Sequence, residues 1–375
     1  KDGVRNSHTS HAEVMFSLDG KPQENAGCVI GAALCYNGNY KLRIDTHDDE
    51  YHRFFAGINE ENSAYSLKKD EIFRTPELAL TYSNEGLSGS SRNFHRWARL
   101  HKLAHGTVPR KILLNSWEGV YFDVNQAGMD QMMSDIASMG GELFVMDDGW
   151  FGDKYPRKND SSSLGDWVVD KNKLPNGIEG LLKDAQKNGV KFGIWIEPEM
   201  ANTTSEFYEK HPDWVIKAPE RDVVQGRGGT QVVLDLANPQ VQEFIFKIVD
   251  DLMSNYPEID YIKWDANMSI LNHGSNYLTK DNQSHMYIEF HRGFEKICQR
   301  IRAKYPDLTI QACASGGGRV NYGILPYFDE FWVSDNTDAL QRIYMQWGTS
   351  YFFPAIAMAS HIRPLPTTRL SAPFL

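Results

Sequence analysis

Long apolar runs, clustered basic residues and cysteine are all scarce in this sequence of 375 residues. No segment reaches the ~18 consecutive apolar residues of a membrane-spanning helix, and the nearest one, residues 351–362, is interrupted by Pro354 and Ser360. The formal net charge is -10 and no basic stripe occurs, whereas nucleic-acid binding depends on clustered Lys and Arg. The four cysteines form no CxxC pattern and are too few for a disulfide framework. We therefore expect no contact with membranes or with nucleic acid.

The start of the chain also lacks two features, an initiator methionine and an apolar signal segment. We interpret this as the removal of a leader or as a fragment of a longer chain whose true N-terminus is not visible. We expect a cytoplasmic location, with a periplasmic or secreted one as the alternative.

Apolar and aromatic residues, by contrast, are plentiful enough for a large folded core. They make up 41% and 12% of the chain, and it is low hydrophobicity that keeps chains disordered. At ~150 residues per domain, the length allows two domains or one large barrel with an attachment.

The first part of the chain, residues 1–95, predicts short antiparallel strands between turns. A helical spacing of apolar residues over Ser91–His105 then predicts a connector, which we assign to residues 96–110. The predicted strands are Val29–Cys35, Tyr40–Ile44, Phe54–Ile58 and Glu77–Tyr82.

After Arg110 the sequence alternates between continuous apolar runs and amphipathic segments, as expected of parallel strands that are covered by helices on both faces. The predicted strands are Lys111–Asn115, Glu142–Asp147, Lys191–Glu197, Gln231–Asp235, Asp260–Asp265, Leu308–Cys313, Glu330–Asp335 and Pro354–His361. The clearest helices are Gln126–Met139, Ile178–Lys187, Val241–Met253 and Met286–Lys304. Eight such units over residues 111–375 match a (β/α)8 TIM barrel in number and size. A doubly wound open sheet is the alternative, but no Gly-x-Gly-x-x-Gly follows an early strand.

Polar and aromatic residues follow almost every predicted strand of this barrel. The clusters include Trp117-Glu118, Asp147-Asp148, Trp195-Ile196-Glu197, Lys263-Trp264-Asp265 and Ser334-Asp335. The carboxyl ends of barrel strands converge on one rim, where barrel enzymes carry out their chemistry. Paired carboxylates supply nucleophile and acid for the cleavage of glycosidic bonds, and Trp offers an apolar face to a sugar ring. The pattern therefore favours a sugar-cleaving site at this rim.

In several of these segments the chain resembles the α-galactosidases of glycoside hydrolase family 36. The resemblance covers roughly Arg110 to His361 in unbroken order, and the β-rich start is similar to the end of that family's N-terminal β-sandwich domain. It rests on Trp117-Glu118, Asp147-Asp148-Gly149-Trp150, Leu164-Gly165-Asp166-Trp167, Trp195-Ile196-Glu197-Pro198-Glu199, Lys263-Trp264-Asp265 and Ser334-Asp335-Asn336-Thr337-Asp338. It implies an α/β fold, a (β/α)8 TIM barrel preceded by part of an antiparallel β-sandwich domain.

The resemblance also implies a retaining enzyme that acts on α-galactoside oligosaccharides such as melibiose and raffinose. The family's nucleophile matches Asp265 and its acid/base matches Asp335. In physical terms, Lys263 would favour the charged form of Asp265. The apolar residues Phe331 and Trp332 would raise the pKa of Asp335, which must begin protonated.

The resemblance assigns contacts on the sugar as well. Asp147 and Asp148 resemble the pair that accepts hydrogen bonds from the galactose 4- and 6-hydroxyls, an arrangement that favours an axial 4-hydroxyl. Trp117 and Trp195 resemble apolar walls of the sugar pocket.

Further sugar contacts are implied by the same resemblance, and Trp332 is also predicted as a substrate-binding residue. Lys263 and Asn267 resemble ligands of ring hydroxyls, and Cys313 and Gly316 resemble the loop beside the 2-hydroxyl. Arg227 is a candidate for the family's arginine before the fourth strand, but Gly228-Gly229-Thr230 intervene, so we leave it out of the predicted site.

Several alternatives stay open at this level. Asp147 and Asp148 could form a site for Mg²⁺ or Ca²⁺, but without further carboxylates at fitting spacing we expect no metal and no cofactor. Cys313 could be a core thiol or a nucleophile, and packing beside substrate is the preferred interpretation. Asp338 is expected to cap a following helix.

Two rival functions also remain. One is an α-galactosyl transferase of the raffinose- or stachyose-synthase type, and the other is an inactive α-galactoside-binding fragment. The second arises because residues 362–375 depart from the family pattern, which we interpret as a truncated barrel. A homo-oligomer is left open for the full-length protein.

Overall fold

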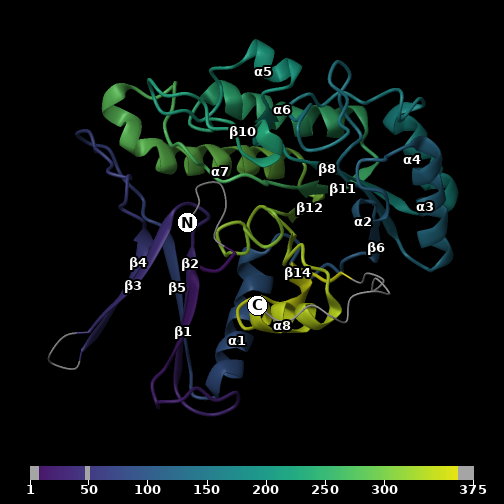
Figure 1. Cartoon of the computed structure of the whole chain (residues 1–375). Helices are drawn as coiled ribbons and strands as arrows, with labels where there is room; N and C mark the ends of the chain where they lie inside the picture. The colour runs from purple at the N-terminus through teal and green to yellow at the C-terminus, as the bar shows by residue number, and fades with distance from the viewer. Residues whose placement is uncertain (1–7, 47–50, 362–375) are drawn as a thin grey trace, which may run out of the picture.

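A computed structural model describes residues 8–46 and 51–361, which form an N-terminal β region beside a larger α/β region (Figure 1). Three strands of the β region form an antiparallel sheet in the order β1-β2-β5, and two others form a hairpin. The bounds are β1 (Glu13–Ser17), β2 (Val29–Cys35), β3 (Tyr40–Thr46), β4 (His52–Ile58) and β5 (Glu77–Ser83). The antiparallel character expected for this part of the chain is confirmed.

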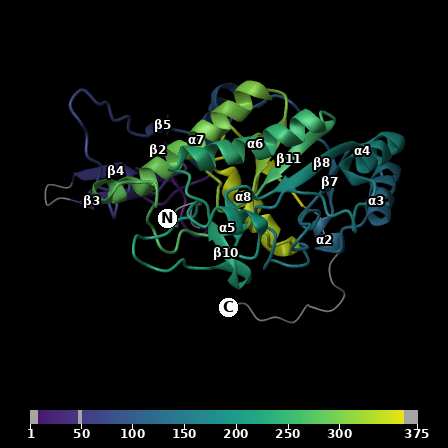
Figure 2. The same ribbon diagram turned by 90° about the horizontal axis from the view of Figure 1, so that it is seen from above.

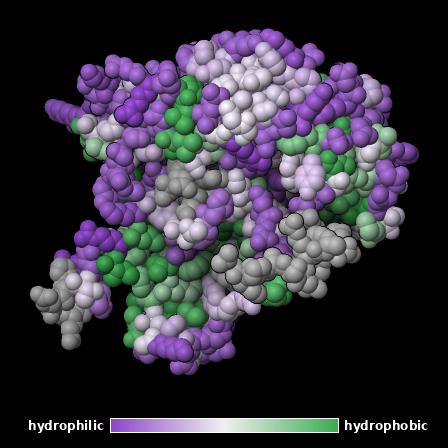
Figure 3. Space-filling view, in the orientation of Figure 1, coloured by the Kyte–Doolittle hydropathy of each residue, from purple (hydrophilic) through white to green (hydrophobic). Residues whose placement is uncertain are grey.

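Several apolar side chains of the β region are exposed. Leu80 and Tyr82 on β5 are 64% and 58% exposed, and Ile44 and Phe55 of the hairpin are exposed as well. Figure 3 shows apolar surface where Figure 1 draws β1, β2 and β5. This sheet is therefore only partly covered within the described residues.

The connector is a helix that begins earlier than the sequence predicts. Helix α1 (Gly86–Trp97) is followed by a π-helical turn, Ala98–Lys102. Its first turns are rich in Gly and Ser, poor helix formers, but Ser90 and Ser91 are buried, and a Cβ at Gly31 of β2 would lie 2.5 Å from Ser90 Oγ. Close packing on β2 thus outweighs the weak helix propensity of this segment.

The α/β region contains one parallel sheet of seven strands, in the order β14-β13-β12-β11-β8-β7-β6. The bounds are β6 (Leu113–Asn115), β7 (Leu143–Met146), β8 (Lys191–Ile196), β11 (Ile259–Trp264), β12 (Thr309–Ala312), β13 (Glu330–Trp332) and β14 (Met358–Ala359). Its residues share one large core with Phe94 and Ala98 of the connector. Seven of the eight predicted strands thus join a single parallel sheet.

The strand expected at Gln231–Asp235 does not join this sheet. It forms β10 (Gln231–Val233), which pairs antiparallel with β9 (Met200–Asn202). Strands β8 and β11 pair directly, with Trp195 opposite Lys263, so no space remains between them. Gly193 of β8 allows this approach, because a Cβ there would lie 2.9 Å from the Cβ of Tyr261. The prediction of a parallel strand at this position is therefore wrong.

Helices cover the outer face of the sheet, with α3 and α4 on one side and α6 and α7 above it (Figures 1 and 2). The long helices are α3 (Gln126–Ser138), α4 (Gly177–Asn188), α6 (Pro239–Asn255), α7 (Met286–Lys304) and α8 (Ala339–Ser350). The short ones are α2 (Trp117–Val120), α5 (Glu206–Lys210) and the 3-10 turns Arg227–Gly229, Lys280–His285 and Ala355–Ala357. Asp338 caps α8 as predicted, its side chain accepting from the N–H of Gln341 at 2.9 Å. Among residues 8–46 and 51–361, no helix has the length and hydropathy that a membrane span requires.

Candidate active site

The polar residues that follow the strands lie along one edge of the seven-stranded sheet. Asp147 follows β7, Asp265 follows β11 and Cys313 follows β12. The parallel ladder continues through this edge, because the N–H groups of Asp265 and Cys313 donate to the carbonyls of Ile196 and Trp264, each at 2.8 Å. The sheet itself therefore fixes the backbone that carries these side chains.

The carboxyl of Asp265 is 6% exposed and fully engaged. Its Oδ2 accepts from Asn267 Nδ2 at 2.8 Å and from Trp195 Nε1 at 3.3 Å, and its Oδ1 accepts from the N–H of Ala266 at 2.8 Å. Burial alone would raise the pKa of Asp265, but the charge of Lys263 and these hydrogen bonds outweigh it and lower the pKa. Asp265 is thus held as a carboxylate.

Lys263 and Asp147 form an ion pair next to this carboxylate. Lys263 Nζ donates to Asp147 Oδ2 at 2.8 Å, and the same oxygen accepts from Asn115 Nδ2 at 2.6 Å. Burial alone would lower the pKa of Lys263, but the charges of Asp147 and Asp265 outweigh it and raise the pKa. A cation therefore lies between two carboxylates at the rim.

Asp148 points toward a different partner. Arg157 Nε and Nη2 donate to its two oxygens at 3.0 and 2.7 Å, and the guanidinium lies over the rings of Phe122 and Phe151. Burial raises the pKa of Asp148, and the charge of Arg157 only partly opposes it. Arg157 already donates to both oxygens of Asp148, so a sugar hydroxyl would have to share these oxygens with it. Contact between Asp148 and a sugar hydroxyl remains a prediction.

Asp335 lies shortly after β13 and is exposed at the rim. Desolvation by the surrounding side chains and then the charge of Asp265 raise its pKa, the direction that the sequence predicts. Trp332 also has an effect in the opposite direction, which the sequence does not indicate. Its Nε1 donates to Asp335 Oδ1 at 2.9 Å, a bond that stabilises the carboxylate and lowers the pKa.

The loop after β12 packs against the strand end that carries Asp335. Gly316 adopts φ +81°, and a Cβ there would lie 2.5 Å from the backbone nitrogen of Asp335, so only glycine fits. Cys313 is 1% exposed, and burial, with the charge of Asp265, raises the pKa of its thiol. A thiol that stays protonated packs beside the carboxylates and is a poor nucleophile.

A cavity of about 620 Å³ runs between the two end strands of the sheet, β6 and β14, and reaches this rim at Asp335, whereas Asp265 and Asp147 are not among its lining residues. Trp117, Lys263, Trp332 and Asp335 are among its lining residues. Trp117 is the first residue of α2, and its backbone N–H donates to the Oδ1 of Asn115 at 2.8 Å. Trp195, by contrast, is 2% exposed, so it supports Asp265 from behind and presents little surface to the cavity.

Sequence reasoning missed Glu197 as a site residue. Its side chain is 1% exposed and accepts from Gln231 Nε2 at 3.0 Å and from the N–H of Asn267. Burial and the charge of Asp265 raise the pKa of Glu197 to about 8. The other rim residues are predicted because they follow the carboxyl end of a strand. Glu197 directly follows β8, so the same criterion would have identified it.

Two further residues support the site from its edges. Arg227, which the sequence prediction leaves out, pairs with Asp160 at 3.3 Å, and its charge lowers the pKa of Glu197. The N–H and Oγ of Ser315 donate to Asn267 Oδ1 at 3.1 and 3.0 Å. This contact turns the Nδ2 of Asn267 toward Asp265. No local sequence pattern indicates such a contact.

A metal site receives no support from the part of the chain that the structure describes. There, no group of three His, Cys, Asp or Glu side chains is arranged to hold an ion. The two paired carboxylates that suggested one, Asp147 and Asp148, have Lys263 and Arg157 as their cations.

Comparisons with protein families agree over the whole length of the chain. Residues 72–372 match the family model described as melibiase, and residues 1–68 match the model described as the glycosyl hydrolase family 36 N-terminal domain. The α-galactosidase C of Emericella nidulans is 38% identical over 97% of this chain and 49% of its own. The α-galactosidase AgaA of Geobacillus stearothermophilus is 38% identical over 92% of this chain and 46% of its own.

Solved structures give the same result. The crystal structure of AgaA superposes with a TM-score of 0.94 at 35% identity, covering 99% of this chain and 52% of that one. The α-galactosidase of Lactobacillus brevis superposes with the same score, covering 98% and 49%. Variants of AgaA are described in complex with raffinose and with stachyose. The match confirms the expected barrel class, and the chain spans about half the length of the relatives that it matches.

Proposed function

Because the chain belongs to the melibiase family, and its first part to the N-terminal domain of glycoside hydrolase family 36, we propose that it is a retaining α-galactosidase. Its substrates are oligosaccharides with a terminal non-reducing α-D-galactosyl residue, such as melibiose and raffinose. The bound sugars of the AgaA variants support this class of substrate.

The opposite pKa shifts of two rim carboxyls carry this proposal. Lys263 and Asn267 hold Asp265 ionised, whereas desolvation and the charge of Asp265 favour the protonated form of Asp335. Two carboxyls pushed apart in this way are the pattern of a nucleophile and a general acid.

In the first step, a carboxylate oxygen of Asp265 attacks the anomeric carbon. The glycosidic C–O bond breaks, and Asp335 transfers its proton to the leaving oxygen. In the second step, Asp335 takes a proton from water, the water oxygen attacks the anomeric carbon, and the bond to Asp265 breaks. Two inversions return the α-anomer.

The sugar contacts follow from the lining of the rim. Trp117 offers an apolar face at the cavity. Lys263, Asp147 and Asn267 supply donors and acceptors for ring hydroxyls. The packing of Gly316 against Asp335 leaves little room near the 2-hydroxyl.

Proton NMR of fresh hydrolysate tests this function. We expect raffinose and an aryl α-galactoside to be cleaved with α-galactose as the first product, and an Asp265→Ala variant to be inactive on both. β-Galactose as the first product would overturn retention. Binding without turnover would favour the inactive binding fragment, and galactosyl transfer to an added acceptor in preference to water would favour the transferase.

A further inference from the structure

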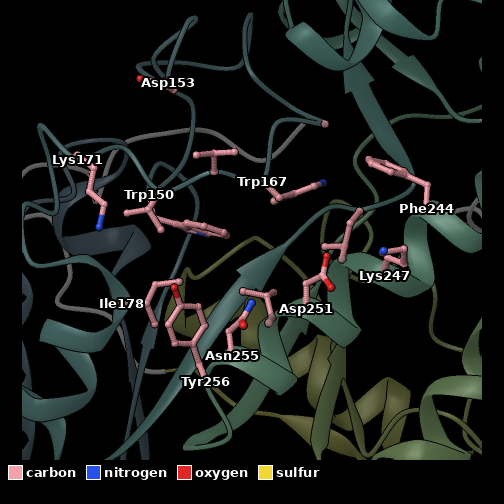
Figure 4. Close-up of a pocket in the computed structure, with 15 residues that line it drawn as sticks. Trp150, Asp153, Trp167, Lys171, Ile178, Phe244, Lys247, Asp251, Asn255 and Tyr256 are labelled. Atoms are coloured by element: carbon pink, nitrogen blue, oxygen red, sulfur yellow. The ribbon is translucent and has the colours of Figure 1, made fainter.

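A second concave site lies away from the catalytic rim. It is a groove of about 570 Å³ between helix α6 and the segment that joins β7 to α4 (Figure 4). None of its lining residues lines the rim cavity. The groove is therefore a separate feature of the molecule.

Half-buried aromatic rings form much of the groove surface. Trp167 packs against Phe151 with ring centroids 4.7 Å apart, and Phe244 packs against Phe207 at 4.6 Å. Tyr256 lies at the end of α6. Because packing fixes Trp167 and Phe244 from behind, their free faces and edges form a preorganised apolar surface.

Exposed polar groups border these rings. Lys247, Asp251 and Asn255 recur every four residues along α6, so they form one polar stripe beside the apolar side chains. Lys171 and Asp153 add exposed charges from the segment that joins β7 to α4. The two lysines balance the two aspartates, so the groove selects neither an anionic nor a cationic ligand.

One donor in the groove has no acceptor. The Nε1 of Trp167 is screened from solvent and makes no hydrogen bond among the described residues. In Figure 4 the nitrogen end of this ring points toward Phe244. Because solvent does not reach this nitrogen, a ligand in the groove would contact the ring of Trp167 and not its N–H.

We propose that this groove is a second saccharide-binding site that takes a neutral oligosaccharide. Sugar rings present apolar C–H faces that stack on aromatic rings, and their hydroxyls can hydrogen-bond with a polar border. A purely apolar peptide would make no use of the exposed polar stripe of Lys247, Asp251 and Asn255. The choice of a neutral sugar follows from the groove, and only the choice of a galactoside as one probe rests on the proposed function.

Saturation-transfer NMR with two probes, raffinose and maltotriose, tests the proposal. Maltotriose lacks the axial 4-hydroxyl that the proposed catalytic site favours, so its signal reports on the groove. Two variants alter the groove: Phe244→Leu removes a flat ring but keeps apolar volume, and the double change Asp251→Ala with Asn255→Ala removes exposed polar groups. The matched controls are Phe55→Leu on β4 and Gln240→Ala, which is on α6 outside the groove.

We expect maltotriose to bind, and both groove variants to weaken its binding by about tenfold while the controls leave it unchanged. Raffinose, which the proposed catalytic site also binds, serves as the comparison. Absence of maltotriose binding, or maltotriose binding that the groove variants do not change, would overturn the proposal. Thermal unfolding of each variant checks that the fold is intact, and the exposed double change keeps the test valid if Phe244→Leu destabilises the chain. Sugar binding in the groove without any turnover of α-galactosides would contradict the proposed function and leave this proposal standing.

Discussion

Arg157 donates hydrogen bonds to both carboxylate oxygens of Asp148, from Nε at 3.0 Å and from Nη2 at 2.7 Å. The two side chains are 2% and 5% exposed, so neither charge has water as a substitute partner. Asn202 accepts a further bond from Nη1 at 3.1 Å. The pair therefore connects the segment after β7 to strand β9 behind the catalytic rim.

Replacing Arg157 by Ala leaves the charge of Asp148 buried without a partner, which costs about 3–5 kcal/mol of unfolding free energy. Urea denaturation measures this change. The matched control is Lys154→Ala in the same segment, whose pair with Glu209 is exposed, and it should leave stability unchanged. Equal stability of Arg157→Ala and the parent would contradict the role of this pair.

Replacing Asp265 and Asp335, the two aspartates to which the proposed function gives catalytic roles, should separate those roles. Asp265→Ala removes the nucleophile, so activated and natural substrates both stall, and azide attacking from the vacated face yields β-galactosyl azide. Asp335→Ala removes only proton donation, which contributes ~10²–10⁴-fold. An aryl galactoside with a good leaving group should therefore lose far less rate than raffinose.

Azide should also rescue Asp335→Ala, but with α-galactosyl azide as product, because azide then intercepts the covalent intermediate. NMR identification of the two azides is the measurement. Exchanged products would mean that the two roles are reversed. In a crystal structure of the parent, the two carboxyls should lie about 5–5.5 Å apart, the separation of retaining enzymes.

Gly316→Ala should abolish the proposed activity, because the new Cβ would lie 2.5 Å from the backbone nitrogen of Asp335 and force this proposed acid/base to move. Gly140→Ala is the matched control. Gly140 has nearly the same φ, +82°, but open space around it, so the change adds only backbone strain of about 1–2 kcal/mol. We expect kcat to fall sharply in the first variant and to persist in the second. Loss of activity in both would show that general strain, and not this contact, is responsible.

Stability should decline between about pH 5 and pH 8 because of Glu13. Burial raises its pKa from 4.5 to about 8 in the folded chain. Over this range the unfolded state releases a proton that the folded state keeps, so a rise in pH favours unfolding. Glu197, whose pKa burial also raises to about 8, contributes a decline over the same range, so Glu13→Gln should make the slope shallower without abolishing it in denaturation series at several pH values. The control Glu61→Gln changes an exposed residue, so the dependence of its unfolding free energy on pH should equal that of the parent. An unchanged dependence in Glu13→Gln would exclude Glu13 as a cause.

Metal removal should not affect turnover, because Lys263 and Arg157 already serve as the cations of Asp147 and Asp148. Activity measured after exhaustive EDTA treatment should match that of untreated enzyme. A loss that one specific divalent ion restores would refute this expectation.

The sequence predicts much of the sheet and most of the rim. Helix α7 has the predicted bounds, Met286–Lys304, because its apolar residues recur with helical period over five turns. Strand β10 shows what apolar patterns in a sequence do not predict. A short apolar run such as Gln231–Val233 indicates an extended segment, but its partner depends on whether β8 and β11 leave a gap.

The contacts behind the rim could not be predicted in the same way. Arg319 pairs with Glu199 at 2.5 Å, and both are almost fully buried, yet they are far apart in the sequence and no periodicity links them. The hydrogen bond from Trp332 to Asp335 shows a second limit, because a sequence gives the type of a neighbouring side chain but not the direction of its donor.

The order of strands in the sheet has a consequence for when the proposed active site is assembled during folding. Asp147 follows β7 and Asp335 follows β13, and the strands between them join the sheet through long crossover segments. Parallel pairing of this kind forms slowly, because each crossover must close before its contacts form. The rim is complete only when β13 has paired with β12. We therefore expect the proposed activity to return late in refolding, and the strands that are still unpaired to be open to aggregation until then.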